Sequence, residues 1–355
     1  MSSYAIVTLP GDGIGPEVTE SALAVVRAAA AAHGGVELDV TEHDASAGRW
    51  QRTGVALPDE TLTACAAADA ILMGAVGLPE ARHPDGREVN GDVILRLRFE
   101  LDLYAGIRPI RSFAGVPTPL AGDAPIDYVI VRENVEGLLA SSGTCIREEV
   151  ATDTLTITDT GTRKVSEAAF ALAEQRAGKR KVTCVDKSNA VAAYAFFRRV
   201  FDRVAAGHDT VEADYAYIDA MTAYQVLRPE TFDVVVTENM FGDIISDLGG
   251  ATVGGLGLAP SGDVGDEHAM FQPSHGSAPG IAGRGVANPV ATILSAAMML
   301  DWLGRRHDDA AAREVAAVVD AAVVRVLADR TVITPDLGGT ATTTELTAAV
   351  VAALG

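Results

Sequence analysis

Short apolar runs alternate with longer stretches in which apolar residues recur at helical spacing, and this alternation continues along almost the whole chain. The short runs are typical of buried strands, and the helical spacing is typical of helices that pack on one face. The predicted strands are Tyr4–Leu9, Ala70–Val76, Asp127–Arg132, Lys181–Asp186, Val211–Ile218 and Phe232–Thr237. The predicted helices include Pro16–Ala31, Ser166–Ala177, Ala190–Ala205, Pro289–Leu303 and Ala310–Ala328. Strands alternating with helices favour an α/β fold.

One segment, Thr144–Thr162, departs from this rhythm because it is polar and rich in β-branched residues. Its apolar and polar residues alternate over Thr154–Thr158, which predicts a β-hairpin that projects from the body. The sequence leaves open whether this arm pairs with a second subunit or is a plain surface hairpin.

Composition limits the classes of function. Of 355 residues, 48% are hydrophobic and 21% charged, enough for a sizeable core in two domains or in one domain with an insertion. The net charge of −20 disfavours nucleic acid as a partner, so an anionic substrate would need a local basic site. No apolar stretch is long enough to span a bilayer, and no signal peptide is visible.

Three cysteines, Cys65, Cys145 and Cys184, form no C-x-x-C pair. An odd, scattered set speaks against a disulfide framework or a thiolate zinc site. We therefore expect a protein of the reducing cytoplasm.

A glycine cluster, Gly11-Asp12-Gly13-Ile14-Gly15-Pro16, directly follows the first predicted strand. It differs from the G-x-G-x-x-G dinucleotide fingerprint in spacing, and no acidic residue follows at the usual distance. A tight turn from strand to helix explains it equally well, so we do not predict a Rossmann fold.

Two aspartates, Asp243 and Asp247, lie four residues apart at the start of a predicted helix, so their carboxylates share one face. Two hard anionic ligands on one face suit Mg²⁺ or Mn²⁺. Acidic residues in a first helical turn can also simply complement the helix dipole, and the pair alone does not decide.

Arginines and one lysine stand where an α/β protein places its ligand-binding residues. Arg132 ends a predicted strand, Lys187 follows another, and Arg98 and Arg108 lie ten residues apart. Strand ends point into the crevice of such folds, and the planar guanidinium donates two hydrogen bonds to one carboxylate. A lysine beside a metal can relay a proton. Each arginine taken alone could equally be an ordinary ion-paired residue.

Seven motifs in fixed order resemble the isocitrate/isopropylmalate dehydrogenase family, and the resemblance covers essentially the whole chain. They are Leu9–Glu17, the Arg98 to Arg108 spacing, Arg132-Glu133-Asn134, Asp186-Lys187-Ser188-Asn189, Asp219-Ala220-Met221, Asn239–Asp247 and His275-Gly276-Ser277-Ala278-Pro279. By this resemblance the chain is a metal-dependent, decarboxylating dehydrogenase of a small 2-hydroxy diacid.

The resemblance also implies roles for individual residues. Substrate carboxylates would bind to Arg98, Arg108 and Arg132, with the variable group against Ile94 and Leu95. Asp243 and Asp247 would hold Mg²⁺ or Mn²⁺, joined by Asp219 of a partner subunit. Lys187, also from the partner, would relay a proton, and Asp219 would assist in catalysis. The positions that resemble the nucleotide site are Ile14, Asn189, His275, Gly276, Ser277, Ala278, Gly280, Ile281, Asn288 and Asp336.

The implied architecture is two α/β domains that share a mixed sheet. Residues 1–103 and 254–355 would form a discontinuous nucleotide-binding domain. Residues 104–253 would form the central dimerisation, metal and substrate domain, with the arm at 144–162. The implied assembly is a homodimer whose active sites are shared, without nucleic acid or membrane partners.

Two positions depart from the family's pattern at the catalytic and cofactor ends. Leu139 stands where relatives carry a tyrosine that protonates the product, and leucine cannot donate a proton. Gly280 stands where NAD-using relatives carry an acid and NADP-using ones a base. Ile281 resembles the NAD group, while Arg284 could reach a 2′-phosphate. We expect NAD in preference to NADP.

The substrate's variable group would face Ile94, which favours an isopropylmalate-like group over the third carboxylate of isocitrate. The flanking Asp92 and Arg96 leave room for a tartrate- or malate-type substrate. A different class of function, a non-catalytic regulatory subunit that binds the ligand, is favoured only by Leu139. The intact Lys187 and aspartates favour the enzyme.

Overall fold

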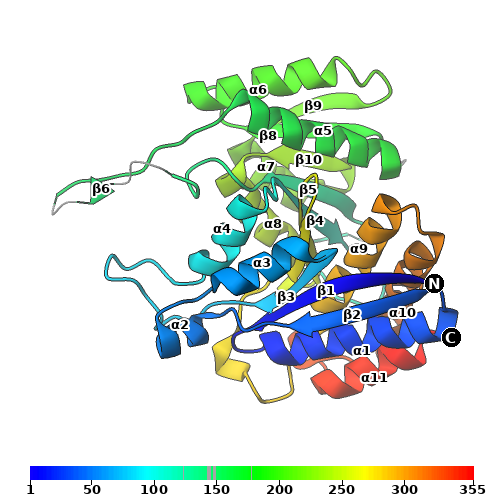
Figure 1. Ribbon diagram of the computed structural model, residues 1–355. Coiled ribbons are helices and arrows are strands. Elements are labelled where there is room, and N and C mark those ends of the chain that lie inside the picture. The colour runs from blue at the N-terminus through cyan, green and yellow to red at the C-terminus, as the bar shows by residue number, and fades with distance from the viewer. Residues whose placement is uncertain (123, 142–144, 147–148, 177) are drawn as a thin grey trace.

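One mixed sheet of ten strands runs through the molecule, with helices on both of its faces (Figure 1). Its strand order is β2-β1-β3-β12-β11-β4-β5-β10-β8-β9. Neighbours pair in parallel except at β12–β11, β11–β4 and β4–β5, which are antiparallel. The computed structural model describes residues 1–122, 124–141, 145–146, 149–176 and 178–355, and of 145–146 only the backbone. The predicted α/β class with a shared mixed sheet is confirmed.

The strands of the large sheet are β1 (Ser2–Gly11), β2 (Val36–Glu42), β3 (Ala70–Ala75), β4 (Ala105–Arg111), β5 (Asp127–Glu133), β8 (Lys181–Asp186), β9 (Glu212–Tyr217), β10 (Val234–Thr237), β11 (Pro260–Val264) and β12 (Ala269–Pro273). The helices are α1 (Gly15–His33), α2 (Ala47–Thr53), α3 (Asp59–Ala67), α4 (Gly91–Glu100), α5 (Asp159–Arg176), α6 (Ala192–Ala205), α7 (Ile218–Leu227), α8 (Asn239–Thr252), α9 (Val290–Arg306), α10 (Ala310–Asp329) and α11 (Thr343–Ala352). Every strand and helix named from the apolar pattern is present, and most lie within a few residues of their predicted bounds. The exception is α5, which begins at Asp159, seven residues before the predicted start at Ser166, and whose predicted end at Ala177 lies outside the described residues.

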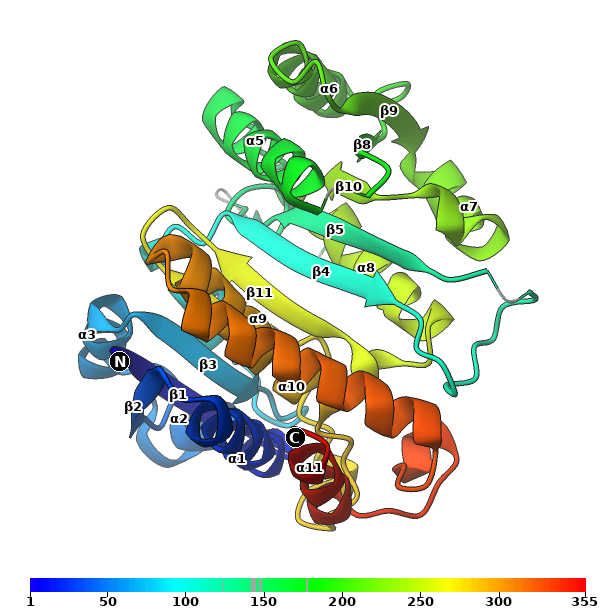
Figure 2. The same ribbon diagram turned by 90° about the vertical axis from the view of Figure 1, so that its right-hand side faces the viewer.

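In one half of the sheet, alternate residues of β1 and β3 enter two different cores, as the two-residue strand period requires. Ile6 and Leu72 pack against α1, α9, α10 and α11, and Val7 and Met73 pack against α2, α3 and α4. Figure 2 shows α9 lying across the sheet beside α1 and α10. This half is therefore a three-layer structure, and its inner strands β3 and β12 are buried on both faces.

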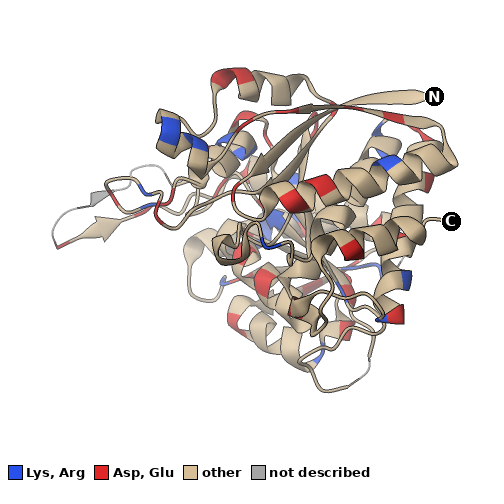
Figure 3. Cartoon of the chain, turned by 90° about the horizontal axis from the view of Figure 1, so that it is seen from below, with Lys and Arg blue, Asp and Glu red and all other residues tan. Residues whose placement is uncertain are grey.

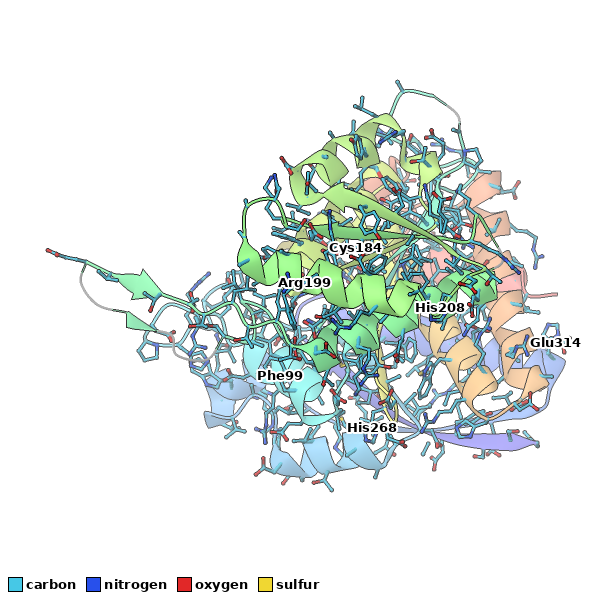
Figure 4. The ribbon with its side chains drawn as sticks, turned by 90° about the horizontal axis from the view of Figure 1, so that it is seen from above. Phe99, Cys184, Arg199, His208, His268 and Glu314 are labelled. Carbon is cyan, nitrogen blue, oxygen red and sulfur yellow. The ribbon has the colours of Figure 1, made fainter. Side chains whose placement is uncertain are left out.

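The other half is built in the same way. Val129 and Val131 of β5 pack against α5 and α6, while Tyr128 and Ile130 pack against α7 and α8. Cys184 lies in the first of these cores, beneath α5 and α6 (Figure 4). Cys65 and Cys184 are both buried free thiols, and the side chain of Cys145 lies outside the described residues.

The order of strands follows the proposed division of the chain. The first five strands in the sheet all come from residues 1–103 and 254–355, and the other five all come from residues 104–253. The antiparallel pairing of β11 with β4 joins the two sets. This order agrees with the proposed domain boundaries, which remain a prediction.

The arm prediction was only partly right. A two-stranded antiparallel ladder is present, formed by β6 (Cys145–Ile146) and β7 (Ala151–Thr152), and it projects from the body (Figure 1). The alternating residues 154–158 lie beyond the ladder and make only one isolated bridge, from Gly137 to Thr156. Helix α5 already begins at Asp159, so 159–162 are helical instead. Residues 144, 147 and 148 of the predicted arm lie outside the described residues.

Four strands, β2, β4, β11 and β12, had no clear signal in the pattern. Strand β11 contains Pro260, Ser261, Gly262 and Asp263, residue types that are depleted in strands. It forms because antiparallel partners flank it on both sides. In the part of the chain that the structure describes, no helix is long and apolar enough to cross a membrane.

Candidate functional site

A cavity of about 320 Å³ opens where the two halves of the sheet meet. It is lined from the end of β3, α4, β4, β5, α8 and the end of β12. The predicted site residues that it brings together are Ile94, Leu95, Arg98, Arg108, Arg132, Asp243, Asp247, His275 and Gly276, together with Leu139.

The three arginines reach this cavity from three different elements. Arg98 lies in the last turn of α4, Arg108 on β4 and Arg132 near the end of β5. Each is at least nine-tenths buried. Figure 3 shows acidic residues recurring on helices throughout the chain, so the arginines form the local basic site that the net charge of −20 requires for an anionic ligand.

Arg132 is fixed by helix α8. Its Nε and one terminal nitrogen donate to Asn239 Oδ1 at 3.1 and 2.8 Å, and its other terminal nitrogen pairs with Asp243. The helix approaches closely because residue 242 is glycine. A Cβ there would lie 2.6 Å from Arg132 Cγ. The absence of a side chain at Gly242 thus sets the distance between the arginine and the two aspartates.

Asp243 and Asp247 lie one turn apart on α8, whose start is capped by the Glu238 carboxylate accepting from the backbone N–H groups of Met240 and Phe241. Burial, followed by repulsion from Asp243, raises the pKa of Asp247. A cation would relieve the repulsion between the two carboxylates, and carboxylate oxygens are the ligands that Mg²⁺ and Mn²⁺ prefer. No group of three or more His, Cys, Asp and Glu side chains is gathered for a metal within the described residues of one chain. A pair of carboxylates that needs a further ligand from elsewhere fits this arrangement.

Burial also acts on the arginines. It lowers the pKa of Arg132 to about 10, and the proximity of Arg98 adds to this effect. Burial likewise lowers the pKa of Arg108, against the attraction of Asp263. Arg108 Nε is buried without a hydrogen-bond partner among the described residues. Buried cations with unused donors are what a dicarboxylate would satisfy.

Lys187 and Asp219 lie outside this cavity. Lys187 Nζ is 2.7 Å from Asp219 Oδ1, and this ion pair lowers the pKa of the Asp219 carboxyl. Both follow strand ends, at the end of β8 and at the start of α7, and neither lines the cavity of its own chain. A single chain therefore brings the arginines together with Asp243 and Asp247, but not with the lysine.

Most of the predicted nucleotide positions lie next to one another beyond His275. Ile14 donates its backbone N–H to the Ser277 carbonyl at 2.8 Å and packs near Ile281. Asn288 Nδ2 donates to Asp336 at 3.0 Å. Ala278 has a left-handed backbone (φ 40°), and the space around the Cβ position of Gly280 is open. Asn189 is exposed on the loop after β8, apart from the other predicted nucleotide positions.

Leu139 stands between the cavity and a second, larger cleft of about 740 Å³, and with Leu95 it lines both. Exposed Phe99 of α4, labelled in Figure 4, is in the wall of the second cleft. Asp92 and Arg96 line only this second cleft and are paired there. Asp92 pairs with His83, and Arg96 pairs with Asp59. They therefore do not face the arginine cavity.

Sequence reasoning missed two residues of the site, Asp263 and Gln272. The Asp263 carboxylate is fully buried on β11, with Arg98 Nε at 3.0 Å, and Gln272 lines the cavity from β12. Both strands were missed because they are short and one contains strand-breaking residue types. The available signal was a single acid directly after the uncharged stretch 251–262, and only the sheet pairing reveals what that acid contacts.

Comparison with known proteins adds an independent line of support. The family model described as isocitrate/isopropylmalate dehydrogenase matches residues 5–350. A 3-isopropylmalate dehydrogenase of Thermobifida fusca is 46% identical over 352 residues, which cover 96% of this chain and 95% of the relative. A 3-isopropylmalate/3-methylmalate dehydrogenase of Methanocaldococcus jannaschii is 44% identical, with 97% and 96% covered.

Solved structures agree with this result. The crystal structure of isocitrate dehydrogenase from Methylococcus capsulatus aligns with a TM-score of 0.88 at 33% identity, covering 99% of both chains. The prediction of the family and of a dehydrogenase is confirmed. The motifs, the fold and these relatives together show that the chain belongs to the isocitrate/isopropylmalate dehydrogenase family.

Proposed function

We propose that this chain catalyses the oxidative decarboxylation of a 3-alkylmalate of the 3-isopropylmalate type, with NAD as the hydride acceptor and Mg²⁺ or Mn²⁺ as the metal. One observation carries the proposal. Three buried arginines, two aspartates on one helix face and the apolar pair Ile94 and Leu95 line the same cavity. Relatives named for 3-isopropylmalate support it.

The apolar pair favours this substrate over isocitrate. A third carboxylate against Ile94 and Leu95 would lose hydration without gaining a partner, which is costly. Asp92 and Arg96, which left room for a tartrate- or malate-type substrate, are paired in the neighbouring cleft. The polar alternatives therefore lose their main support.

In the proposed reaction, the arginines bind the substrate, the aspartates hold the metal and the lysine accepts a proton. Arg98, Arg108 and Arg132 bind the two carboxylates and fix the C2 hydrogen toward the nucleotide. A divalent cation on Asp243 and Asp247 would supply positive charge beside the C2 oxygen. Lys187 of the partner subunit takes the hydroxyl proton while the C2 hydride leaves for NAD. The C3–carboxylate bond of the resulting keto acid then breaks, CO₂ leaves, and C3 takes up a proton.

A homodimer is part of the proposal, because Lys187 and Asp219 lie outside the cavity of their own chain. The adjacent helices α7 and α8 expose Leu227 (77%), Ile244 and Val226 to solvent. An apolar patch of this kind marks an interface, and a twofold axis there would bring each lysine to the other chain's site. A cytoplasmic location, expected from the cysteines, also belongs to the proposal.

NAD is proposed over NADP because Gly280 supplies no positive charge for a 2′-phosphate. Gly280 also gives the ribose no acidic partner, so the preference should be modest. The neighbouring Ser277, Ile281, Asn288 and Asp336 would form the nucleotide site. Arg284 is the residue that would reverse the preference.

The first prediction is a substrate and cofactor profile. With Mg²⁺, kcat/KM should be highest for 3-isopropylmalate among 3-isopropylmalate, isocitrate, homoisocitrate, tartrate and malate, and CO₂ should appear with each reduced NAD. NAD should exceed NADP by about 5- to 150-fold, the range of one or two hydrogen bonds to a charged group. Higher kcat/KM with isocitrate would contradict the substrate assignment. If no diacid reduced either cofactor, the non-catalytic binding role would take its place.

The second prediction concerns the metal. Asp247→Asn should lower kcat/KM by at least about 10²-fold, because a lost ligand carboxylate removes several kcal/mol of charge stabilisation. Mn²⁺ binding, followed by its electron paramagnetic resonance signal, should weaken in parallel. Asp301→Asn, which removes an exposed aspartate paired with Arg305, serves as the control. Wild-type turnover and Mn²⁺ affinity in Asp247→Asn would show that the metal lies elsewhere.

The third prediction concerns Leu139. If the missing hydroxyl slows only the final protonation, Leu139→Tyr should raise kcat with an unchanged KM, because a positioned acid contributes about 10²–10⁴-fold to its step. Leu139→Phe is the matched control, with the ring but without the hydroxyl. Equal loss of kcat/KM in both variants would instead make Leu139 a specificity residue that keeps the cavity open. Ser141, whose hydroxyl accepts from Thr154 N at 2.7 Å, is the described alternative donor, and Ser142 lies outside the described residues.

The fourth prediction tests the shared active site. Leu227→Asp should lower the molecular mass in solution from that of a dimer to that of one chain and abolish turnover, because it buries a charge in the α7–α8 patch. Ala317→Asp places the same charge on an exposed position of α10 and should change neither. Light scattering and initial rates measure both effects. A fully active monomer would refute the sharing of Lys187 between subunits.

A further inference from the structure

A buried carboxylate stands behind the arginine cavity without lining it. Asp263 on β11 is fully buried, and four side chains converge on it. Arg98 Nε and Gln272 Nε2 donate to its Oδ2 at 3.0 and 2.9 Å, while Asn134 Nδ2 donates to its Oδ1 at 2.9 Å. Arg108 lies 3.6 Å from Oδ1. Asp263 thus binds two of the three cavity arginines from the side opposite to the cavity.

These contacts leave the ligand-binding ends of the arginines free. Within the described residues, Arg98 makes one side-chain hydrogen bond, the one through Nε to Asp263. Besides its 3.6 Å ion pair with Asp263, Arg108 donates to Ser274 Oγ at 3.3 Å, and its Nε is unpartnered among the described residues. The third arginine, Arg132, is held separately by Asn239 and Asp243 on α8. Of the three cavity arginines, Asp263 therefore contacts Arg98 and Arg108 directly.

The charges around the cavity give the carboxylate a second effect. Three arginines face two aspartates across it, which leaves one positive charge in excess, and Asp263 cancels that charge from behind. Burial opposes ionisation of Asp263, but the nearby Arg98 and Arg108 keep its pKa below the ordinary value. The buried site accordingly contains a carboxylate anion under ordinary conditions.

We propose that Asp263 is a positioning residue for the substrate, which holds Arg98 and Arg108 in the orientation that binds the two carboxylates of the diacid. The proposal rests on the function proposed above, since it assigns those arginines to the substrate. Besides Asp263, the aspartates that act on Arg108 are Asp243 and Asp247, which line the cavity. Without Asp263, the freed guanidinium would turn toward them, into the space that the diacid occupies.

Positioning and simple charge balance predict opposite signs. If Asp263 only reduced the positive potential, its neutralisation would make the diacid bind more tightly. If it orients the arginines, its neutralisation weakens binding, because preorganised hydrogen bonds to charged groups are lost. The direction of the change in affinity therefore separates the two roles.

The experiment compares wild type with Asp263→Asn, an isosteric change that removes the charge. Binding of 3-isopropylmalate with Mg²⁺ and without NAD is measured by titration calorimetry, and KM and kcat follow from initial rates. We expect Kd and KM for the diacid to rise about 10- to 100-fold, the scale of one or two charge-assisted hydrogen bonds. The KM for NAD should stay unchanged and kcat should fall less than KM rises.

A charge swap tests whether the carboxylate itself is what matters. Because Gln272 donates to Asp263 at 2.9 Å, Asp263→Asn combined with Gln272→Glu returns the carboxylate to the same buried hydrogen bond from its other end. This double variant should regain diacid affinity to within about fivefold of wild type. Asp320→Asn is the control, because it removes an equivalent aspartate from Arg111, on the same strand as Arg108 but at a partly exposed pair.

The outcomes are distinct. Unchanged or tighter diacid binding in folded Asp263→Asn overturns the proposal. If that variant does not fold, the swap tests whether a buried carboxylate is needed at this place: near-wild-type affinity supports the need for it, and a swap that fails to fold or to bind overturns the proposal. A wild type that binds and turns over no diacid refutes the proposed function itself, whereas equal affinity in wild type and Asp263→Asn refutes only the role of Asp263.

Discussion

Three guanidinium groups lie buried around one cavity, and the cost of holding like charges together away from water governs the surrounding structure. Each arginine has a partner on the side opposite to the cavity or beside it. Asp263 forms ion pairs with Arg98 and Arg108, and Arg132 donates to Asn239 and pairs with Asp243. All three arginines also line the cavity, and among the described residues the terminal nitrogens of Arg98 have no hydrogen-bond partner. The folded protein therefore compensates the buried charges and still leaves donors for a ligand.

The sheet is what brings these groups together. Strands β4 and β5 pair antiparallel and carry Arg108 and Arg132, and β11 pairs with β4 on its other edge and brings Asp263 behind them. Helix α8 can lie against Arg132 because Gly242 has no side chain, and its second and third turns supply Asp243 and Asp247. A basic cavity with an acidic wall thus forms at the junction of the two halves of the sheet, in a chain whose net charge is strongly negative.

The position of Lys187 adds a constraint of a different kind. Its ion pair with Asp219 lies at the start of α7, outside the cavity, and the last two residues of the same helix are exposed and apolar. Each chain therefore contains the arginines and metal-binding aspartates of the proposed site and also the proton-accepting lysine, but holds the lysine apart from them. Dimer assembly would then be needed for catalysis, and it would also bury the apolar patch. Leu139, which stands in place of the family's tyrosine, would belong to a site that two chains complete.

The sequence by itself determined the family, the α/β class and about half of the cavity's lining. Ordered motifs and apolar periodicity are local properties of the chain and can be recognised without the fold. Arg98, Arg108, Arg132, Asp243 and Asp247 were all identified before any fold was known. The sequence failed where pairing overrides local preference, as in β11, whose proline, serine, glycine and aspartate resemble a loop. It also extended the arm to residue 162, where α5 had already begun. Only the tertiary structure could decide that Asp263 stands behind two arginines from 155 to 165 residues away, because a buried ion pair depends on which strands become neighbours and leaves no local pattern.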